Sequence, residues 1–213
     1  MRTILRLTLA TLSCLSVLVS PAWGATFRVD PSKSSLVVHI FSDGVAAKLG
    51  HDHVVQATTF SGHITYDPAD PGASSISVQV HTATLKADDP ATRRTFHLRG
   101  EPSATDVAEI EKSMKAESQL HVAKFPMIRF SSTTITAETQ DRFLVTGQLT
   151  IRGVTKAVQF PAKVVMTGKA FRGTATLELA QSAFGYKPYS ALLGAIKNKD
   201  GVTLHIDLVA VPE

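Results

Sequence analysis

The sequence is short of cysteine, because its 213 residues include a single one, Cys14. Cys14 lies inside an apolar run from Leu7 to Val19, in an N-terminal segment that we expect to be removed. The processed chain then has no thiol, which excludes disulfide bonds and thiolate metal ligands. Its stability must come from a hydrophobic core, and residues 25–213 are numerous enough to form one.

The N-terminal segment has the layout of a secretory signal. Arg2 and Arg6 precede the apolar run, Pro21 ends it, and small residues follow. The run is shorter than the roughly 20 residues of a membrane-spanning helix, and no later stretch is as apolar. We therefore expect a signal peptide over residues 1–24, one domain over residues 25–213, and no transmembrane segment in the processed chain.

The sequence also lacks a strong excess of positive charge. Removing residues 1–24 takes away two arginines and lowers the formal net charge from +4 to +2. No basic patch is interleaved with aromatic residues, so we expect no nucleic-acid partner.

Several catalytic signatures are missing as well. The sequence has no Gly-x-Ser-x-Gly elbow, no P-loop, no Rossmann glycine pattern and no helical His-Glu-x-x-His. The acidic pair Asp88-Asp89 lies in a proline-containing loop, which predicts a solvated turn. The basic pair Arg93-Arg94 is predicted on a solvated face. The sequence therefore favours a protein that is not an enzyme.

What the chain does have is alternation of apolar and polar residues with a period of two. Such runs include residues 34–42, 58–67, 74–85 and 127–136, and turn residues separate about eight of them. One apolar and one polar face per strand predicts an all-β, antiparallel barrel of about eight strands. The inward set is either a packed core or the wall of a ligand cavity, and its members are Val38, Ile40, Phe60, Val78, Val80, Phe130, Leu149, Phe160 and Leu177.

Two segments depart from this alternation and predict one or two helical insertions. Residues 103–120 have a helical stripe, and Ser103 and Asp106 have the spacing of a capping box. Within residues 184–199 we expect a short helix over residues 191–197 that covers one end of the barrel. Its apolar residues are Leu192, Leu193 and Ile196.

A histidine cluster offers a different function. In the run Gly50-His51-Asp52-His53, an extended backbone would point both imidazoles the same way, and His39 precedes them. Imidazole suits zinc or copper, so a metal-binding protein or metalloenzyme that uses His39, His51 and His53 is an alternative. A purely structural interpretation is that these residues form hydrogen bonds at a strand end.

The chain resembles the YceI-like family of lipid- and polyisoprenoid-binding proteins. The resemblance rests on five motifs, which are Val29-Asp30-Pro31-x-x-Ser34, Phe60-x-Gly62-x-Ile64, Lys124-Phe125-Pro126-x-Ile128-x-Phe130-x-Ser132, Gly147-x-Leu149-Thr150-Ile151-Arg152-Gly153-Val154-Thr155-Lys156 and Phe184-Gly185. It implies a lipocalin-like, extended barrel whose apolar channel holds a long isoprenoid or other amphipathic lipid. It also implies an exported bacterial protein, usually periplasmic, without catalysis or a cofactor and often dimeric.

The first interpretation is therefore a lipid-binding protein that transports or stores its ligand in the periplasm. The residues expected to line the channel are the inward set together with Phe184, Leu192 and Ile196. The segment from Phe184 to Ile196 is expected to shape or cover one end of the channel, and polar loop residues are expected to hold the head group.

Overall fold

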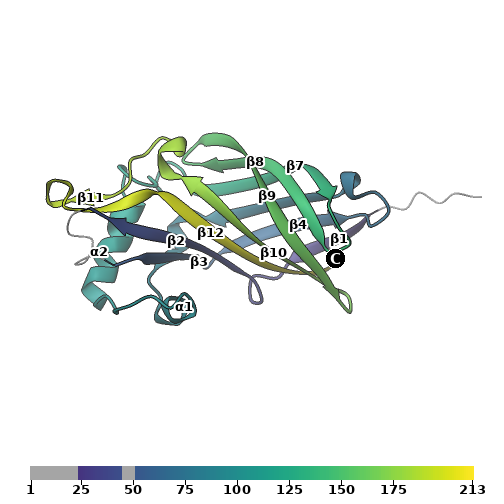
Figure 1. The fold of residues 1–213 in the computed structure, drawn as a ribbon, viewed down its shortest axis with the longest axis horizontal. Helices are drawn as coiled ribbons and strands as arrows, with labels where there is room; N and C mark the ends of the chain where they lie inside the picture. Colours follow the sequence, from purple (N-terminus) through teal and green to yellow (C-terminus); the bar gives the residue numbers. More distant parts are fainter. Residues whose placement is uncertain (1–23, 45–50) are drawn as a thin grey trace, which may run out of the picture.

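One antiparallel sheet that closes on itself forms the body of the molecule (Figure 1). The computed structural model describes residues 24–44 and 51–213. The predicted signal, apart from Gly24, and Gly50 of the histidine cluster lie outside the described residues. The strands are β1 (Ala25–Val29), β2 (Ser35–Asp43), β3 (His53–Ala57), β4 (Phe60–Tyr66), β5 (Ser75–His81), β6 (Leu85–Ala87), β7 (Met127–Ala137), β8 (Arg142–Ile151), β9 (Val154–Thr167), β10 (Ala170–Ala180), β11 (Ser190–Ala191) and β12 (Ile196–Pro212).

Within residues 24–44 and 51–213 the helices are few and short. The α-helices are α1 (Pro90–Thr95) and α2 (Ala104–Lys115), and the 3₁₀ turns include η2 (Pro71–Ala73), η3 (Thr82–Thr84), η4 (Gln181–Phe184) and η5 (Leu192–Gly194). All of these elements lie between residues 25 and 212, so the chain without residues 1–24 holds the whole described fold.

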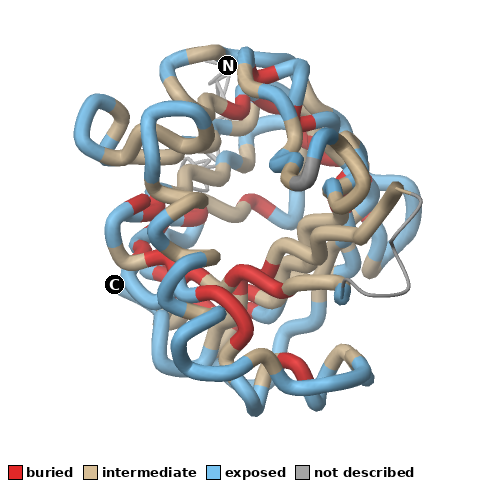
Figure 2. The backbone as a smooth tube through the Cα atoms, turned by 90° about the vertical axis from the view of Figure 1, so that its left-hand side faces the viewer, coloured by how far each residue is buried: buried red, intermediate tan, exposed pale blue. Residues whose placement is uncertain are grey.

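The ring of strands runs β1-β4-β5-β7-β8-β9-β10-β12 and returns to β1, which is eight strands among the described residues. The short strand β1 pairs with β12 only at the C-terminal end of β12. The rest of the same edge of β12 pairs with β2, which in turn pairs with β3. Short breaks also separate β3 from β4 and β5 from β6 along the chain. The predicted barrel of about eight strands is confirmed. Figure 2, which views the molecule end-on, shows strands surrounding a common interior.

Ser34 joins the two halves of the interrupted first strand. The Asp30 amide donates to the Val209 carbonyl, after which the chain leaves the ladder for a turn. At Ser34 the side-chain hydroxyl accepts from the Val209 amide at 2.9 Å and lies 2.7 Å from the Asp30 carbonyl oxygen. A hydroxyl thus replaces one ladder partner of β12, which gives a structural role to the motif around Asp30 and Ser34.

The interior of the barrel contains two groups of buried apolar side chains. One group includes Val29 and Ile64, and the other includes Val145 and Phe160. These positions follow the predicted alternation, because a pleated strand turns every second side chain inward.

The predicted helix over residues 103–120 is confirmed in its first part and ends earlier, at Lys115. Ser103 caps it, and the side chains of Ser103 and Asp106 bond reciprocally to each other's backbone amides. These two bonds satisfy amides that have no partner inside the helix.

The short helix predicted over residues 191–197 is wrong. The chain forms a hairpin there, in which Ser190 pairs with Lys197 and Ala191 with Ile196. The φ angles of Leu193 and Gly194 are 55° and 89°. Two left-handed residues in succession cannot continue a right-handed helix, so the apolar composition of this segment belongs to a turn between strands.

The turn between β8 and β9 lies against the segment that precedes β7. Arg152 and Gly153 have φ angles of 53° and 74°, the signature of a tight hairpin turn. A methyl group at Gly153 would lie 2.7 Å from Phe125 Cε1. The two motifs around Phe125 and Gly153 therefore meet in space, and the glycine is needed for both its backbone and its small size.

Substitution Gly153→Ala is expected to lower the free energy of unfolding by about 2–4 kcal/mol, from backbone strain plus the clash with Phe125. Gly168 is the matched control, because its φ is 60° and an added methyl group would have no atom within 4 Å. Gly168→Ala is expected to cost about 1 kcal/mol from backbone strain alone. Urea denaturation followed by circular dichroism measures both, and equal losses would contradict the contact with Phe125.

Candidate functional site

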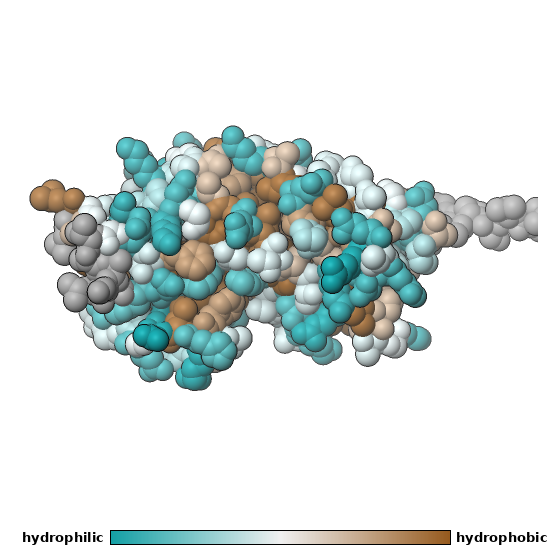
Figure 3. Space-filling view, in the orientation of Figure 1, coloured by the Kyte–Doolittle hydropathy of each residue, from teal (hydrophilic) through white to brown (hydrophobic). Residues whose placement is uncertain are grey.

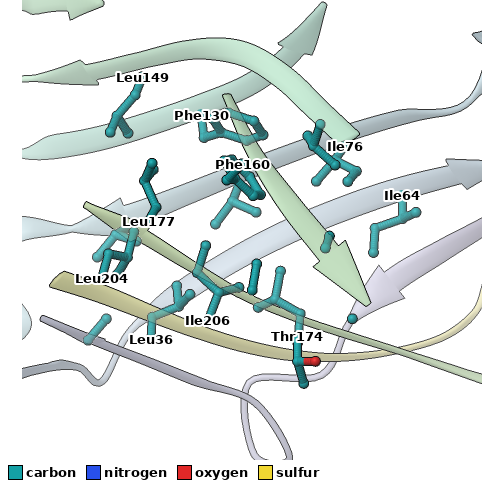
Figure 4. A pocket seen from close by; sticks show the side chains of 18 of the residues that line it. Leu36, Ile64, Ile76, Phe130, Leu149, Phe160, Thr174, Leu177, Leu204 and Ile206 are labelled. Carbon is teal, nitrogen blue, oxygen red and sulfur yellow. The ribbon is translucent and has the colours of Figure 1, made fainter. Parts of the chain in front are cut away.

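The interior of the barrel holds an apolar cavity of about 190 Å³. Figure 4 shows side chains from several strands directed into it, among them Phe130, Phe160 and Leu177. Seven of the residues expected to line a channel are on its wall, and they are Val38, Val78, Val80, Phe130, Leu149, Phe160 and Leu177. These seven members of the inward set therefore surround a cavity in the barrel interior.

Small residues at inward positions leave this space open. Ala162 of β9 pairs with Ala175 of β10, and both line the cavity. Gly147 makes room for a ring, because a methyl group there would lie 2.5 Å from Phe130 Cε2. The glycine of the Gly147-x-Leu149 motif thus lets Phe130 lie close against β8.

A second, larger cavity of about 480 Å³ lies beside helix α2, and we call it the outer chamber. It shares wall residues with the inner cavity, so the two spaces adjoin. The shared residues are Val38, Val55, Leu85, Ile128, Ile151 and Leu179. Ile110 and Met114 of α2 contribute apolar side chains to the chamber, which reaches the surface at the exposed residues His51 and Tyr189.

The outer chamber differs from the inner cavity in having many polar groups. His53, Asp106, Tyr186 and Asn198 are on its wall. Burial raises the pKa of the Tyr186 phenol to about 12, with Asp200 adding to the rise and Arg152 opposing it. The phenol therefore stays protonated at neutral pH and keeps its capacity to donate a hydrogen bond.

The remaining expected channel residues lie elsewhere. Ile40, Phe184 and Ile196 line the outer chamber rather than the inner cavity. Phe60 is buried in the packed core and is on neither wall. The side chain of Leu192 lies outside the described residues. The sequence did not identify Ile110 and Met114 as wall residues, although their helical stripe indicated a buried face.

Arg152 forms hydrogen bonds to two segments that lie near the outer chamber. Its guanidinium donates to the Gly185 carbonyl at 2.7 Å and to the Glu117 carbonyl at 2.8 Å. These bonds connect the β8–β9 turn to the end of η4 and to the loop after α2. Arg152 thus connects two segments that continue into chamber wall residues, Phe184 and Gln119.

His53 belongs to a buried ionic network behind the chamber. Its Nδ1 lies 2.6 Å from Asp88 Oδ2, and Arg93 Nη1 donates to Asp88 Oδ1 at 2.6 Å. Burial raises the pKa of Asp88, but the hydrogen bond and charge of His53 and the hydrogen bonds from Arg93 and the Val54 amide outweigh it, so the net pKa lies below the usual value. Asp88 is therefore ionised, and it orients the His53 ring beside the chamber.

The sequence predicted that Asp88 and Arg93 face solvent, and this prediction is wrong. Asp88 is 3% exposed and Arg93 is 2% exposed. Arg93 also donates to the backbone carbonyls of Asp52, Arg99 and Gly100. The guanidinium is thus satisfied by five hydrogen bonds, which compensate for its loss of water. Sequence alone does not indicate this burial, because the acceptors come from three separate stretches of chain.

The three histidines of the metal alternative do not come together. His51 and His53 have ring centroids 6.2 Å apart and both line the outer chamber. His39 is on β2 but points away from the outer chamber, and its ring lies against Phe41 and Phe96. Within residues 24–44 and 51–213 no group of three histidine, cysteine or carboxylate residues is arranged to hold a metal ion.

Substitution Asp88→Asn is expected to lower the free energy of unfolding at pH 7 by about 3 kcal/mol, because it leaves a buried guanidinium without a counter-charge. The stability lost in this variant depends on pH, because the pKa of Asp88 is lower in the folded state than in the unfolded state. The loss is full above the usual aspartate pKa of 3.8 and shrinks as pH falls below it.

Asp89→Asn is the matched control for this substitution. Asp89 caps α1 by accepting from the Thr92 amide, and asparagine caps a helix equally well. Denaturation of both variants between pH 3 and pH 7 checks the prediction. A similar, pH-independent loss in the two variants would show that the network contributes nothing.

Comparison with known proteins gives matches over most of the chain. A profile of the YceI-like domain matches residues 27–210. A UPF0312 protein of Pseudomonas putida (strain W619) is 31% identical over 194 residues, which cover 86% of this chain and 88% of that protein. A UPF0312 protein of Azotobacter vinelandii is 29% identical, covering 78% of this chain and 76% of its own length.

Solved structures share the fold. BcnA of Burkholderia cenocepacia has a TM-score of 0.68 and 20% identity, with 86% of this chain and 99% of that chain covered. A YceI protein of Campylobacter jejuni has a TM-score of 0.56 and 17% identity, with 75% and 84% covered.

The closed antiparallel barrel with an apolar cavity in its interior defines the class of fold. The chain belongs to the YceI-like family. In the described part of the chain, no helix combines the length and the apolar character required to cross a bilayer.

Proposed function

We propose that this protein binds one amphipathic lipid without acting on it chemically, with the tail in the inner cavity and the head group in the outer chamber. The observation that carries the proposal is the change of chemistry along adjoining spaces. The inner wall is dominated by aliphatic and phenylalanine side chains and its polar residues are limited to a few hydroxyls, whereas the chamber that adjoins it adds imidazoles, amides and carboxylates.

Burial of the tail supplies the affinity. Each methylene removed from water contributes about 0.8 kcal/mol, which corresponds to roughly a fourfold gain in affinity. The aliphatic wall has no pattern of donors that would select one tail by hydrogen bonding, so selection there depends on length and thickness. A long isoprenoid fits this chemistry, as do other amphipathic lipids.

The head group is held by a small number of polar contacts. The protonated Tyr186 phenol and the Asn198 amide are donors, and His53, whose Nδ1 is engaged by Asp88, retains Nε2 for a ligand. Such groups fix the orientation of a ligand whose affinity comes from its tail.

The cellular role follows from the predicted signal. A protein exported by residues 1–24 into the bacterial periplasm would carry or store a lipid that water does not dissolve. The barrel shields the tail from water, and the family resemblance supports this role.

The test is to fill the inner cavity. Ala162→Trp places an indole among the cavity wall residues, and Ala157→Trp places the same group at an exposed position of the same strand. The chain is expressed with residues 1–24, the processed protein is purified from the bacterial periplasm, and bound lipid is measured by solvent extraction and mass spectrometry.

We expect lipid with the unaltered protein and with Ala157→Trp, and at least a tenfold loss with Ala162→Trp. Circular dichroism checks that both variants are folded. The absence of lipid from all three proteins, together with no binding of a fluorescent fatty acid, would refute the proposal.

A further inference from the structure

The turn between β11 and β12 exposes a large apolar side chain. Leu193 is completely exposed, and its backbone has a left-handed φ of 55°. A leucine in this conformation is strained and gains nothing from contact with the rest of the chain. In Figure 3 a brown projection stands out at the far left, where Figure 1 places the β11–β12 turn.

This turn lies at the mouth of the outer chamber. Tyr189 immediately precedes β11 and Ile196 begins β12, and both residues line the chamber. Tyr189 is also 42% exposed, so its ring extends from the chamber wall to the surface. We call residues 186–199 the mouth loop.

The charge of the mouth loop has one sign. It contains Lys187, Lys197 and Lys199 and no acidic residue. Lys197 is 46% exposed even though its ammonium lies 3.2 Å from Asp43 Oδ2, and Lys187 is exposed. Leucine, tyrosine and lysine together are typical of segments at a membrane surface, where the apolar group enters the head-group region and lysines meet anionic lipids.

We propose that the mouth loop docks on the surface of a bilayer containing anionic lipids, with Leu193 inserted among the head groups. The mouth of the chamber then faces the membrane, and a lipid passes between bilayer and barrel without crossing water. The transfer role rests on the proposed function, whereas docking itself is tested separately.

The β9–β10 turn provides a matched control. Val165 and Met166 are 46% and 45% exposed, and they lie beside the turn that pairs with the opposite end of β12. They are exposed apolar residues far from the chamber mouth, as Figure 1 shows for the two turns.

The experiment measures co-sedimentation of the protein without residues 1–24 with vesicles of phosphatidylcholine and phosphatidylglycerol. Leu193→Ser is expected to weaken the vesicle partition by about tenfold, because one leucine side chain is no longer buried. Met166→Ser is expected to leave it unchanged. Less protein is expected to co-sediment with vesicles of phosphatidylcholine alone, or with anionic vesicles at high salt, because the attraction between the lysines and the anionic lipids is then lost or screened.

Four results would overturn the docking proposal. These are no binding to anionic vesicles, equal binding by Leu193→Ser, an equal loss with Met166→Ser, and a dimer in analytical ultracentrifugation that Leu193→Ser disrupts while vesicles bind neither protein. The last result would assign the loop to contact with a second copy.

The lipid content of Leu193→Ser separates this proposal from the one on which it rests. We expect the variant to retain its bound lipid, because Leu193 is outside both cavities. Normal docking by a protein that never contains lipid would refute the carrier function and leave the membrane surface site intact.

Discussion

The pairing of β12 along both edges is the constraint on which the rest of the structure depends. One edge pairs with β10 from Gly201 to Ala210, and the other is shared by β2 and, at the end, β1. This strand closes the ring near its C-terminal end and carries the wall of the outer chamber near its start. The inner cavity and the outer chamber adjoin because a single long strand contributes residues to both of them.

The fold was predictable because it depends on local patterns. Alternation identified the inward faces, turn residues separated the strands, and a capping box marked α2 at Ser103. The predicted helix at residues 191–197 failed because apolar content does not distinguish a helix from a turn, and the left-handed backbone of Leu193 has no strong sequence signal.

The candidate site was predictable only in part, because it depends on contacts between distant segments. The cavity wall followed from alternation, but whether that wall encloses space depends on small residues meeting across strands, as Ala162 and Ala175 do. The burial of Arg93 requires acceptors from separate stretches of chain, the Asp52 carbonyl, the Asp88 carboxylate and the adjacent carbonyls of Arg99 and Gly100. His39 and His53 are on opposite faces of the sheet because His39 is paired with Val54, the residue next to His53.

The hydrogen bonds between β9 and β10 have a consequence for the range of ligands. The two strands pair from Ala162 to Thr167 and from Ala170 to Ala175, and beyond this stretch η4 packs against both. Widening the barrel along this seam displaces side chains and a short 3₁₀ turn instead of a ladder of backbone bonds. For the proposed lipid ligand, this seam is the side of the barrel on which a thicker tail would break the fewest backbone hydrogen bonds.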